Sequence, residues 1–301
     1  MKLVWQGIVE NKIYYFTGTG NSLRAAVKIG KYINDCTLIS MKSNPGDYSA
    51  EHCDVVGFIF PVYHWTMPEP AVEFVEKLKI NPNAYVFCVA MPSIICGEAC
   101  EKLEQILKSK GINLSYGTKI NNVANYVTVY PPMPSPKIVI PRTEKQLEKI
   151  GKEISDRIIR KIPRANAMIR AKIASMKKYK GIQNVADYGF KISNSCVSCG
   201  VCSRVCPVNN IELINSKPHF KHKCAQCMAC VSYCPQNAIG YKLTDKDFEK
   251  MNADPNDFKI AKIMGIPKGR KPYHHPNVSA SDMSKDIINI FSYFSFRFKI
   301  S

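Results

Sequence analysis

The chain has 301 residues, 46% of them hydrophobic, and its 42 lysines and arginines outnumber its 24 aspartates and glutamates. This length allows about two domains with sizeable cores, and the hydrophobic content is ordinary for a soluble protein. No run of about 18 apolar residues occurs, so we expect no transmembrane segment. The first residues lack the apolar stretch and the cleavage site of a secretory signal, so we expect a cytoplasmic protein.

The first expected unit is a strand, a polar turn and a helix. A short β-prone run at residues 12–16 enters the phosphate loop, which consists of Thr17, Gly18, Thr19, Gly20, Asn21 and Ser22. From Leu23 to Ile33, apolar residues recur mostly at three- and four-residue steps, which predicts a helix. Backbone N–H groups and the helix dipole at such a start favour an anion. An ordinary turn with a capping serine is the alternative.

The sequence of this loop differs from two common nucleotide-binding loops. A dinucleotide-binding fold has a third glycine near position 23, where leucine stands, and a triphosphate loop has lysine where Asn21 stands. The hydroxyl-rich pattern is instead similar to the phosphate loop of the flavodoxins, which bind FMN. This resemblance implies that residues 17–22 hold the FMN phosphate.

Two more strand–loop–helix units follow. Residues 54–60 and 84–90 read as buried strands, and helices are predicted at 69–79 and 98–108. Three such units predict a doubly wound α/β sheet, whose ligands bind beyond the carboxyl ends of the strands. All three connecting loops are expected at that edge. A fifth strand is expected between residues 111 and 130.

The flavodoxins share this layout, and the resemblance implies a parallel sheet of five strands in the order 2-1-3-4-5. It also implies that the two later loops hold the flavin ring, through Pro61, Val62, Tyr63, His64, Trp65, Met91, Pro92, Ser93 and Gly97. A planar ring favours aromatic neighbours, so Tyr63 and Trp65 are the most direct candidates. Core packing is the alternative for both, and His64 also fits a surface loop. Cys96 and Cys100 fit either a redox pair or packed small side chains.

A proline-rich stretch at residues 131–136 is predicted to hold neither helix nor central strand and to end the first domain. Residues 142–180 then carry 13 basic and 4 acidic residues in a helical pattern interrupted at Pro163. One interpretation of this charge is a solvated face, and another is a docking face for acidic redox partners. No base-reading module accompanies it, so nucleic acid is not an expected partner.

Two cysteine runs with identical spacing follow, 28 residues apart. Each has the C-x-x-C-x-x-C-x-x-x-C-P spacing of iron–sulfur proteins, in which the fourth cysteine ligates the other cluster. The first predicted [4Fe–4S] ligand set is Cys196, Cys199, Cys202 and Cys234. The second is Cys224, Cys227, Cys230 and Cys206. Zinc usually takes its ligands from separated pairs, and disulfides are rare in a reducing compartment, so both alternatives fit less well.

Residues 194–241 closely resemble the bacterial two-cluster ferredoxins. The whole arrangement, together with Asn125-Tyr126, resembles the flavodoxin–ferredoxin fusion proteins of anaerobic bacteria and archaea. The resemblance implies a flavodoxin-like domain at 1–140, a basic helical connector at 141–188, a small α+β ferredoxin domain at 189–243 and a C-terminal extension at 244–301. The aromatic tail at residues 286–298 is predicted to pack on the body, with a surface anchor as the alternative.

FMN beside two clusters makes a converter between two-electron and one-electron transfer. We therefore expect an electron-transfer protein that exchanges electrons between FMN, two [4Fe–4S] clusters and external redox proteins. One alternative is a flavin-dependent reductase of a small molecule, with Tyr63 or His64 as its general acid. The other is a redox-sensing regulatory protein, which the basic connector would support. No substrate can be identified from the sequence, so enzymatic activity stays an open question.

Overall fold

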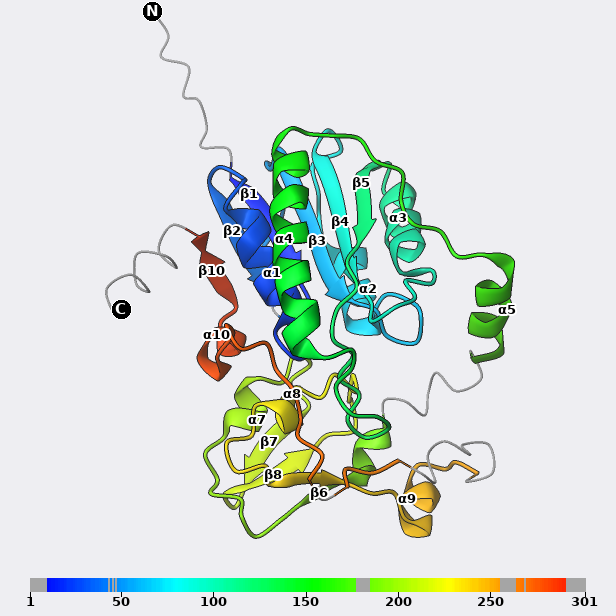
Figure 1. Cartoon of the computed structure of the whole chain (residues 1–301), viewed down its shortest axis with the longest axis vertical. Helices are drawn as coiled ribbons and strands as arrows, with labels where there is room; N and C mark the ends of the chain where they lie inside the picture. Colours follow the sequence, from blue (N-terminus) through cyan, green and yellow to red (C-terminus); the bar gives the residue numbers. More distant parts are fainter. Residues whose placement is uncertain are drawn as a thin grey trace, which may run out of the picture.

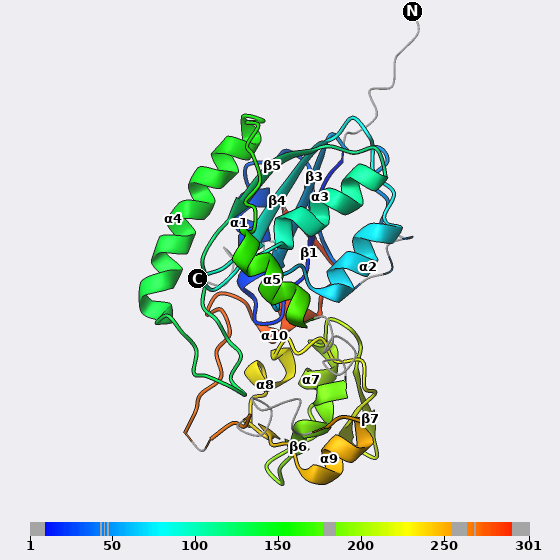
Figure 2. The ribbon, with the colours of Figure 1, turned by 90° about the vertical axis from the view of Figure 1, so that its right-hand side faces the viewer.

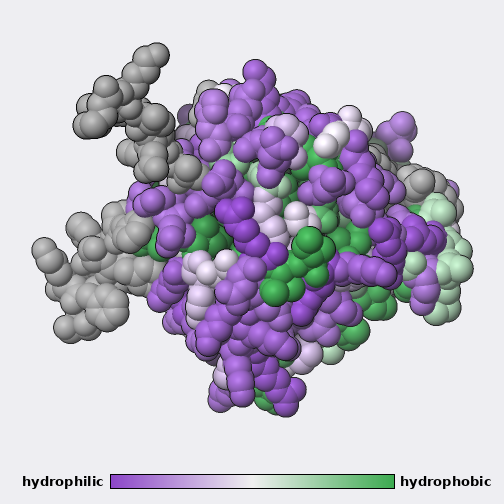
Figure 3. Space-filling model, turned by 90° about the horizontal axis from the view of Figure 1, so that it is seen from above, coloured by the Kyte–Doolittle hydropathy of each residue, from purple (hydrophilic) through white to green (hydrophobic). Residues whose placement is uncertain are grey.

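The computed structural model describes residues 10–42, 44, 46, 48–176, 185–254, 264–267 and 269–290. Its larger part is a sheet with helices on both faces, and a small domain that contains both cysteine runs lies beyond one end of the sheet (Figures 1 and 2). Among the described residues, no helix is both long enough and apolar enough to cross a membrane. The opposite end of the molecule, seen in Figure 3, is mostly hydrophilic.

The main sheet has the strand order β10-β2-β1-β3-β4-β5. Its strands are β1 (Asn11–Tyr15), β2 (Cys36–Ser40), β3 (Val55–Pro61), β4 (Tyr85–Met91), β5 (Leu114–Lys119) and β10 (Ile287–Asn289). The first five pair in parallel, which confirms the predicted doubly wound order 2-1-3-4-5. Strands β3 and β4 are almost entirely apolar because helices cover both of their faces.

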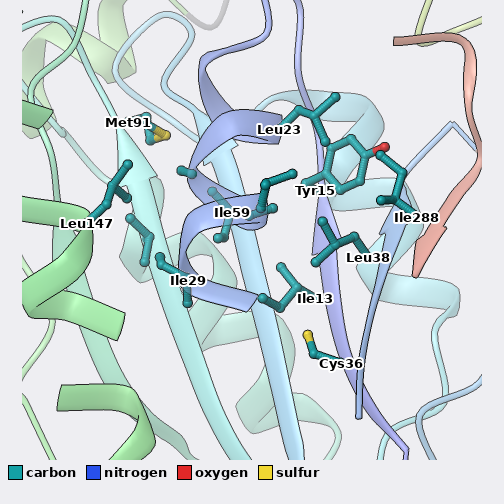
Figure 4. Close-up of a cluster of buried hydrophobic side chains, with 14 of the residues drawn as sticks. Ile13, Tyr15, Leu23, Ile29, Cys36, Leu38, Ile59, Met91, Leu147 and Ile288 are labelled. Atoms are coloured by element: carbon teal, nitrogen blue, oxygen red, sulfur yellow. The ribbon is translucent and has the colours of Figure 1, made fainter. Parts of the chain in front are cut away.

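The sixth strand was not predicted. In β10, Ile288 pairs antiparallel with Leu38 of β2. The added strand covers an edge of β2 that would otherwise present unpaired backbone groups. Ile288 is buried, and Figure 4 shows it near Leu38 and Tyr15. The predicted packing of the tail thus holds for residues 286–290, and the rest of that prediction lies outside the described residues.

Helices α1 (Asn21–Gly30) and α4 (Pro136–Ser155) cover one face of the sheet, and α2 (Glu69–Lys77) and α3 (Ala99–Ser109) cover the other (Figure 2). Each face has its own apolar core. On the first face, Ile29 of α1 lies on the side of Leu147 of α4, and Leu23 lies on the other side of α1 near Tyr15 (Figure 4).

Helix α4 includes residues 141–155 of the predicted connector and packs along α1. Its Glu144 accepts a 2.8 Å hydrogen bond from Arg24, and Glu148 lies 2.9 Å from Lys28. The helix starts at Pro136, so the prediction of no helix in the proline run is wrong at its last residue. Proline is tolerated there because the first helical N–H has no partner within the helix. After Pro163, α5 (Ala167–Met176) follows.

The small domain is built from short elements around the cysteine runs. They are η3 (Ala186–Gly189), β6 (Phe190–Ile192), α7 (Val201–Arg204), β7 (Ile211–Ile214), β8 (Lys217–Phe220), α8 (Ala229–Ser232) and β9 (Ile239–Tyr241). Strands β6 and β9 pair antiparallel, as do β7 and β8. The chain then forms α9 (Asp245–Lys250), returns to the larger domain and forms α10 (Ala280–Ser284) before β10. The predicted small α+β domain is confirmed.

Candidate functional site

The phosphate loop connects β1 to α1 in the predicted way. Its Gly20 has a φ of 90°, a left-handed conformation that glycine adopts without strain. The Gly20 N–H donates a 3.1 Å hydrogen bond to Thr17 Oγ1, which holds the turn closed. No side chain caps the start of α1, and Thr17 and Ser22 are buried. A helix start with free N–H groups beside buried hydroxyls suits an anionic group.

The second and third predicted loops lie against each other. Tyr63 and Thr66 exchange backbone hydrogen bonds of 3.1 and 2.9 Å, with His64 and Trp65 at the tip of the turn. Both tip residues have positive φ, at 49° and 60°, which is uncommon outside glycine. The Glu98 N–H, just after the third loop, donates a 2.8 Å bond to the Trp65 carbonyl. The structure therefore brings the predicted ring-binding residues of both loops to one place.

Tyr63 connects its loop to the phosphate loop. Its ring meets Phe16 edge-on at 6.2 Å, and its hydroxyl lies 2.9 Å from the position that a β-carbon on Gly18 would take. Burial raises the pKa of Tyr63 well above its usual value, with smaller contributions from the thiols of Cys227 and Cys224. His64 is exposed and Trp65 is half-buried.

The two cysteine runs adopt the same backbone conformation. In the first, Ser198 and Gly200 on either side of the second cysteine have φ values of 57° and 70°; in the second, Gln226 and Met228 have 51° and 61°. Each run then enters a one-turn helix, α7 or α8. Left-handed residues in matching places bend both loops alike, so the sequence repeat is also a structural repeat.

Thiols of the two runs lie close enough to affect one another's ionisation. Among the described residues, no three His, Cys, Asp or Glu side chains form the compact group expected for a single metal ion. Burial raises the pKa of Cys202 to about 11, and three neighbouring thiols contribute to the increase: Cys234, Cys199 and Cys196. Burial likewise raises the pKa of Cys227 to about 12, and the next contribution is from Cys206 of the first run. This grouping supports the predicted exchange of the fourth cysteines.

Backbone amides point at several of these sulfurs. The Asn210 N–H lies 3.2 Å from Cys206 Sγ, the Gln226 N–H 3.2 Å from Cys224 Sγ, and the Ala238 N–H 3.3 Å from Cys234 Sγ. Such bonds stabilise thiolates and tune the potential of a cluster. The donor set therefore fits two iron–sulfur clusters. The nearby His222 is hydrogen-bonded to Asp187, with 2.7 Å between His222 Nδ1 and Asp187 Oδ1.

The phosphate loop and the second cysteine run are in direct contact. A β-carbon added to Gly18 would lie 2.3 Å from the carbonyl oxygen of Cys227 and 2.8 Å from its β-carbon. Cys227 also packs against the apolar core that α1 and α4 share. Only glycine permits an approach this close, because any side chain would collide with the Cys227 backbone.

Asn125 and Tyr126 form hydrogen bonds that connect the two domains. Asn125 Nδ2 donates a 2.9 Å bond to Ser232 Oγ in the small domain and a 2.6 Å bond to the Tyr273 carbonyl. The Tyr126 hydroxyl donates to Gln226 Oε1 within the second cysteine run. Both side chains of the pair therefore hold the cysteine-bearing loops in position.

A C-terminal strap, residues 273–278, passes over the phosphate loop. The Tyr273 hydroxyl donates a 2.8 Å bond to Asn21 Oδ1, and the His275 N–H donates a 2.8 Å bond to the Thr19 carbonyl. The side chain of Val278 reaches Gly20, within 2.9 Å of where its β-carbon would be. These contacts join residues about 250 positions apart that share no motif, so no local sequence pattern predicts them.

Cys96 and Cys100 lie with their sulfurs 3.8 Å apart, and Cys88 Sγ lies 3.8 Å from Cys100 Sγ. All three are buried in the core beneath α2 and α3. The hydrogen bond with Cys100 and burial raise the pKa of Cys96 far above its usual value, so its thiol stays protonated. A protonated, buried thiol is a poor nucleophile, which favours packing over redox chemistry for this group.

A family model described as "4Fe-4S binding domain" matches residues 190–212 and 219–240. The chain contains a 4Fe–4S binding domain. Because this 4Fe–4S domain follows a domain with the flavodoxin strand order, the chain has the architecture of a flavodoxin–ferredoxin fusion protein. No curated protein matches the chain.

The chain is similar to several solved structures, including the following three proteins. The rubredoxin oxygen:oxidoreductase of Desulfovibrio gigas is 13% identical with a TM-score of 0.35, and the match covers 55% of this chain and 37% of that one. A Fusobacterium nucleatum flavodoxin mutant bound to flavin mononucleotide is 15% identical, with a TM-score of 0.37 and coverages of 50% and 99%. A flavodiiron core from Synechocystis is 17% identical, with a TM-score of 0.36 and coverages of 49% and 35%. The fold assignment rests on the chain's own strand order.

Proposed function

We propose that the chain is an electron-transfer flavo-iron–sulfur protein that exchanges electrons between FMN, two [4Fe–4S] clusters and external redox proteins. The observation that carries this proposal is the contact between Gly18 of the phosphate loop and Cys227 of the second cysteine run. A flavin held by that loop and a cluster held by that run would be near neighbours. Bound FMN supplies the change between two-electron and one-electron transfer, and the clusters carry single electrons.

The residues proposed for FMN fit an anionic, planar ligand. The phosphate loop offers the uncapped start of α1 together with the buried hydroxyls of Thr17 and Ser22. The two later loops, which Trp65 and Glu98 join, offer aromatic and apolar side chains at the same edge of the sheet. These loops follow β1, β3 and β4, which are adjacent in the sheet, as the switch-point rule for doubly wound folds requires.

The exposure of the cysteines suggests an order for the electron carriers. Cys227 touches the phosphate loop, whereas Cys199 of the other ligand set is exposed at the surface. The cluster on Cys224, Cys227, Cys230 and Cys206 would exchange electrons with the flavin. The cluster that includes Cys199 would meet the external partner.

No specific observation favours either alternative, the small-molecule reductase or the redox-sensing regulatory protein. Tyr63, one of the two candidate general acids for a small-molecule reductase, is directed at Gly18, and burial raises its pKa, so it suits packing better than proton transfer. The basic segment proposed for a regulatory contact is partly neutralised, because Arg164 and Arg170 both pair with Glu101 of α3. Free thiols and clusters persist under reducing conditions, so we propose a cytoplasmic location.

The direct test is oxygen-free purification followed by iron, sulfide and flavin analysis and a stepwise reductive titration. We expect about eight irons per chain, as two [4Fe–4S] clusters require, and one FMN. Protein that takes up zinc instead of iron, or that binds no flavin after incubation with FMN, would contradict the proposal.

A further inference from the structure

Tyr233 lies in the 4Fe–4S domain, directly before Cys234, and faces the flavodoxin-like domain. It is 7% exposed and belongs to the apolar core that also contains Leu23 of α1 and Val278 of the strap. Its ring stacks on His274, with the centroids 4.5 Å apart and the planes 22° from parallel. The stacking and the surrounding core therefore restrict the position of its hydroxyl group.

This hydroxyl group is buried and has no hydrogen-bond partner in the described part of the chain. A buried hydroxyl without a partner loses its hydration and gains nothing in return, so native proteins nearly always supply one. The neighbouring Tyr273 illustrates the usual case, because its hydroxyl donates to Asn21. The Tyr233 hydroxyl, by contrast, needs a partner that the described residues do not provide.

The hydroxyl points to the phosphate loop. It lies 2.7 Å from the position that a β-carbon on Gly20 would take, at the uncapped start of α1. Two nearby cations of α1 are already engaged, since Arg24 is paired with Glu144 and Lys28 with Glu148. An anion at the loop would therefore benefit from a further donor, and a phenol O–H is such a donor.

We infer that the Tyr233 hydroxyl donates a hydrogen bond to the phosphate group of FMN, so that a residue of the 4Fe–4S domain completes the flavin site of the other domain. The inference rests on the proposed function and adds a residue to it. It also explains how the domains are kept in register: the flavin phosphate becomes a contact between them, alongside Asn125 and the strap.

The test compares flavins with and without a phosphate. Wild-type protein and the variant Tyr233→Phe are stripped of flavin without oxygen and titrated with FMN and with riboflavin, with binding followed by quenching of flavin fluorescence. Phenylalanine keeps the ring that packs on His274 and removes only the hydroxyl. A hydrogen bond to a charged group contributes enough that FMN affinity should fall about 10- to 100-fold in the variant. Riboflavin affinity should be unchanged.

The matched control is Tyr241→Phe. Tyr241 is as buried as Tyr233 and lies in the same domain, but its hydroxyl donates to the Ala186 carbonyl, away from the loop. The FMN affinity of the Tyr241→Phe variant should equal that of the wild type. Iron content is measured first for both variants. If Tyr233→Phe fails to keep its iron, replacement of Tyr233 by 3-fluorotyrosine, a stronger donor, should tighten FMN binding selectively.

The outcomes separate this inference from the function on which it rests. If the wild type binds FMN and Tyr233→Phe binds it equally well, the inference is wrong and the proposed function stands. If the variant loses FMN and riboflavin affinity equally, Tyr233 acts on the packing of the site and the inference is also wrong. If inorganic phosphate competes with FMN in the wild type but not in Tyr233→Phe, the phosphate contact is supported. A wild type that binds no flavin would overturn both.

Discussion

Gly18 of the phosphate loop and Cys227 of the second cysteine run lie in van der Waals contact: a β-carbon on Gly18 would be 2.3 Å from the Cys227 carbonyl oxygen. The two residues are more than 200 positions apart and belong to different domains. Their contact places the predicted flavin loop and one predicted cluster loop side by side. If these loops hold the flavin and a cluster as proposed, electrons would pass between the domains across this contact.

Gly18→Ala should weaken this contact. The methyl group would collide with the backbone of Cys227 rather than with a flexible side chain, so the loops must separate. We expect a loss of about 1–3 kcal/mol in the free energy of unfolding and slower exchange of electrons between flavin and clusters in anaerobic stopped-flow experiments. Gly240→Ala is the control, because its β-carbon would meet nothing nearer than 3.8 Å. Equal behaviour of the two variants would contradict the proposed contact.

Cys199→Ala and Cys227→Ala should have different consequences. Each should lower the iron content from about eight to about four per chain, since each removes a ligand of one cluster. Because Cys227 touches the phosphate loop and Cys199 is exposed, only Cys227→Ala should disconnect the flavin from the remaining cluster. Flavin reduction by a one-electron donor, followed by absorbance, distinguishes the variants. Loss of flavin reduction in Cys199→Ala alone would reverse the proposed order.

Thr17→Val should reduce flavin retention. The Thr17 hydroxyl accepts the Gly20 N–H and holds the phosphate loop in its turn, and valine has the same shape without the acceptor. The lost bond corresponds to about 1 kcal/mol, or roughly a fivefold weaker FMN affinity. Thr17→Ser keeps the hydroxyl and should restore most of the affinity in the same fluorescence titration. An FMN affinity of Thr17→Val equal to that of the wild type would show that this bond does not support the site.

The elements that carry a strong local signal were predicted from the sequence. Strands β3 and β4 are long apolar runs, and the phosphate loop and the cysteine repeat are dense motifs. By contrast, strands β2 (Cys36–Ser40) and β10 (Ile287–Asn289) were not predicted, because both are short. Each is stabilised by pairing with a neighbouring strand: β2 pairs with β1, and β10 pairs with β2. The sequence shows which segments are strands when both faces are buried, but not which distant segment covers an edge.

The part of the site that lies between domains could not be predicted. Tyr233, Tyr273 and His275 belong to no motif, and their positions at the phosphate loop depend on how two domains and a C-terminal strap pack. The boundary at residue 140, which followed the proline run, stays a prediction, and Leu147 of α4 packs in the same core as α1. Composition indicated a charged helix there, but not that one of its faces is buried.

The strap should loosen over the phosphate loop as the solution becomes acidic, through His275. This side chain is 3% exposed, and burial lowers its pKa to about 4; Glu144 opposes the shift, while Arg24 and His274 add to it. Its Nδ1 accepts a 3.2 Å bond from the Asn277 N–H, which a protonated ring cannot do.

Because the folded pKa lies below the usual 6.5, the unfolded chain binds more protons between those values. The stability contributed by neutral His275 is therefore present above about pH 6.5 and is lost as the pH falls towards 4, by up to about 3 kcal/mol. Melting temperature and FMN affinity measured between pH 7.5 and pH 5 should both fall. His275→Gln keeps a polar side chain without the titration and should flatten this part of the dependence. An unchanged slope in that variant would assign the effect to other groups.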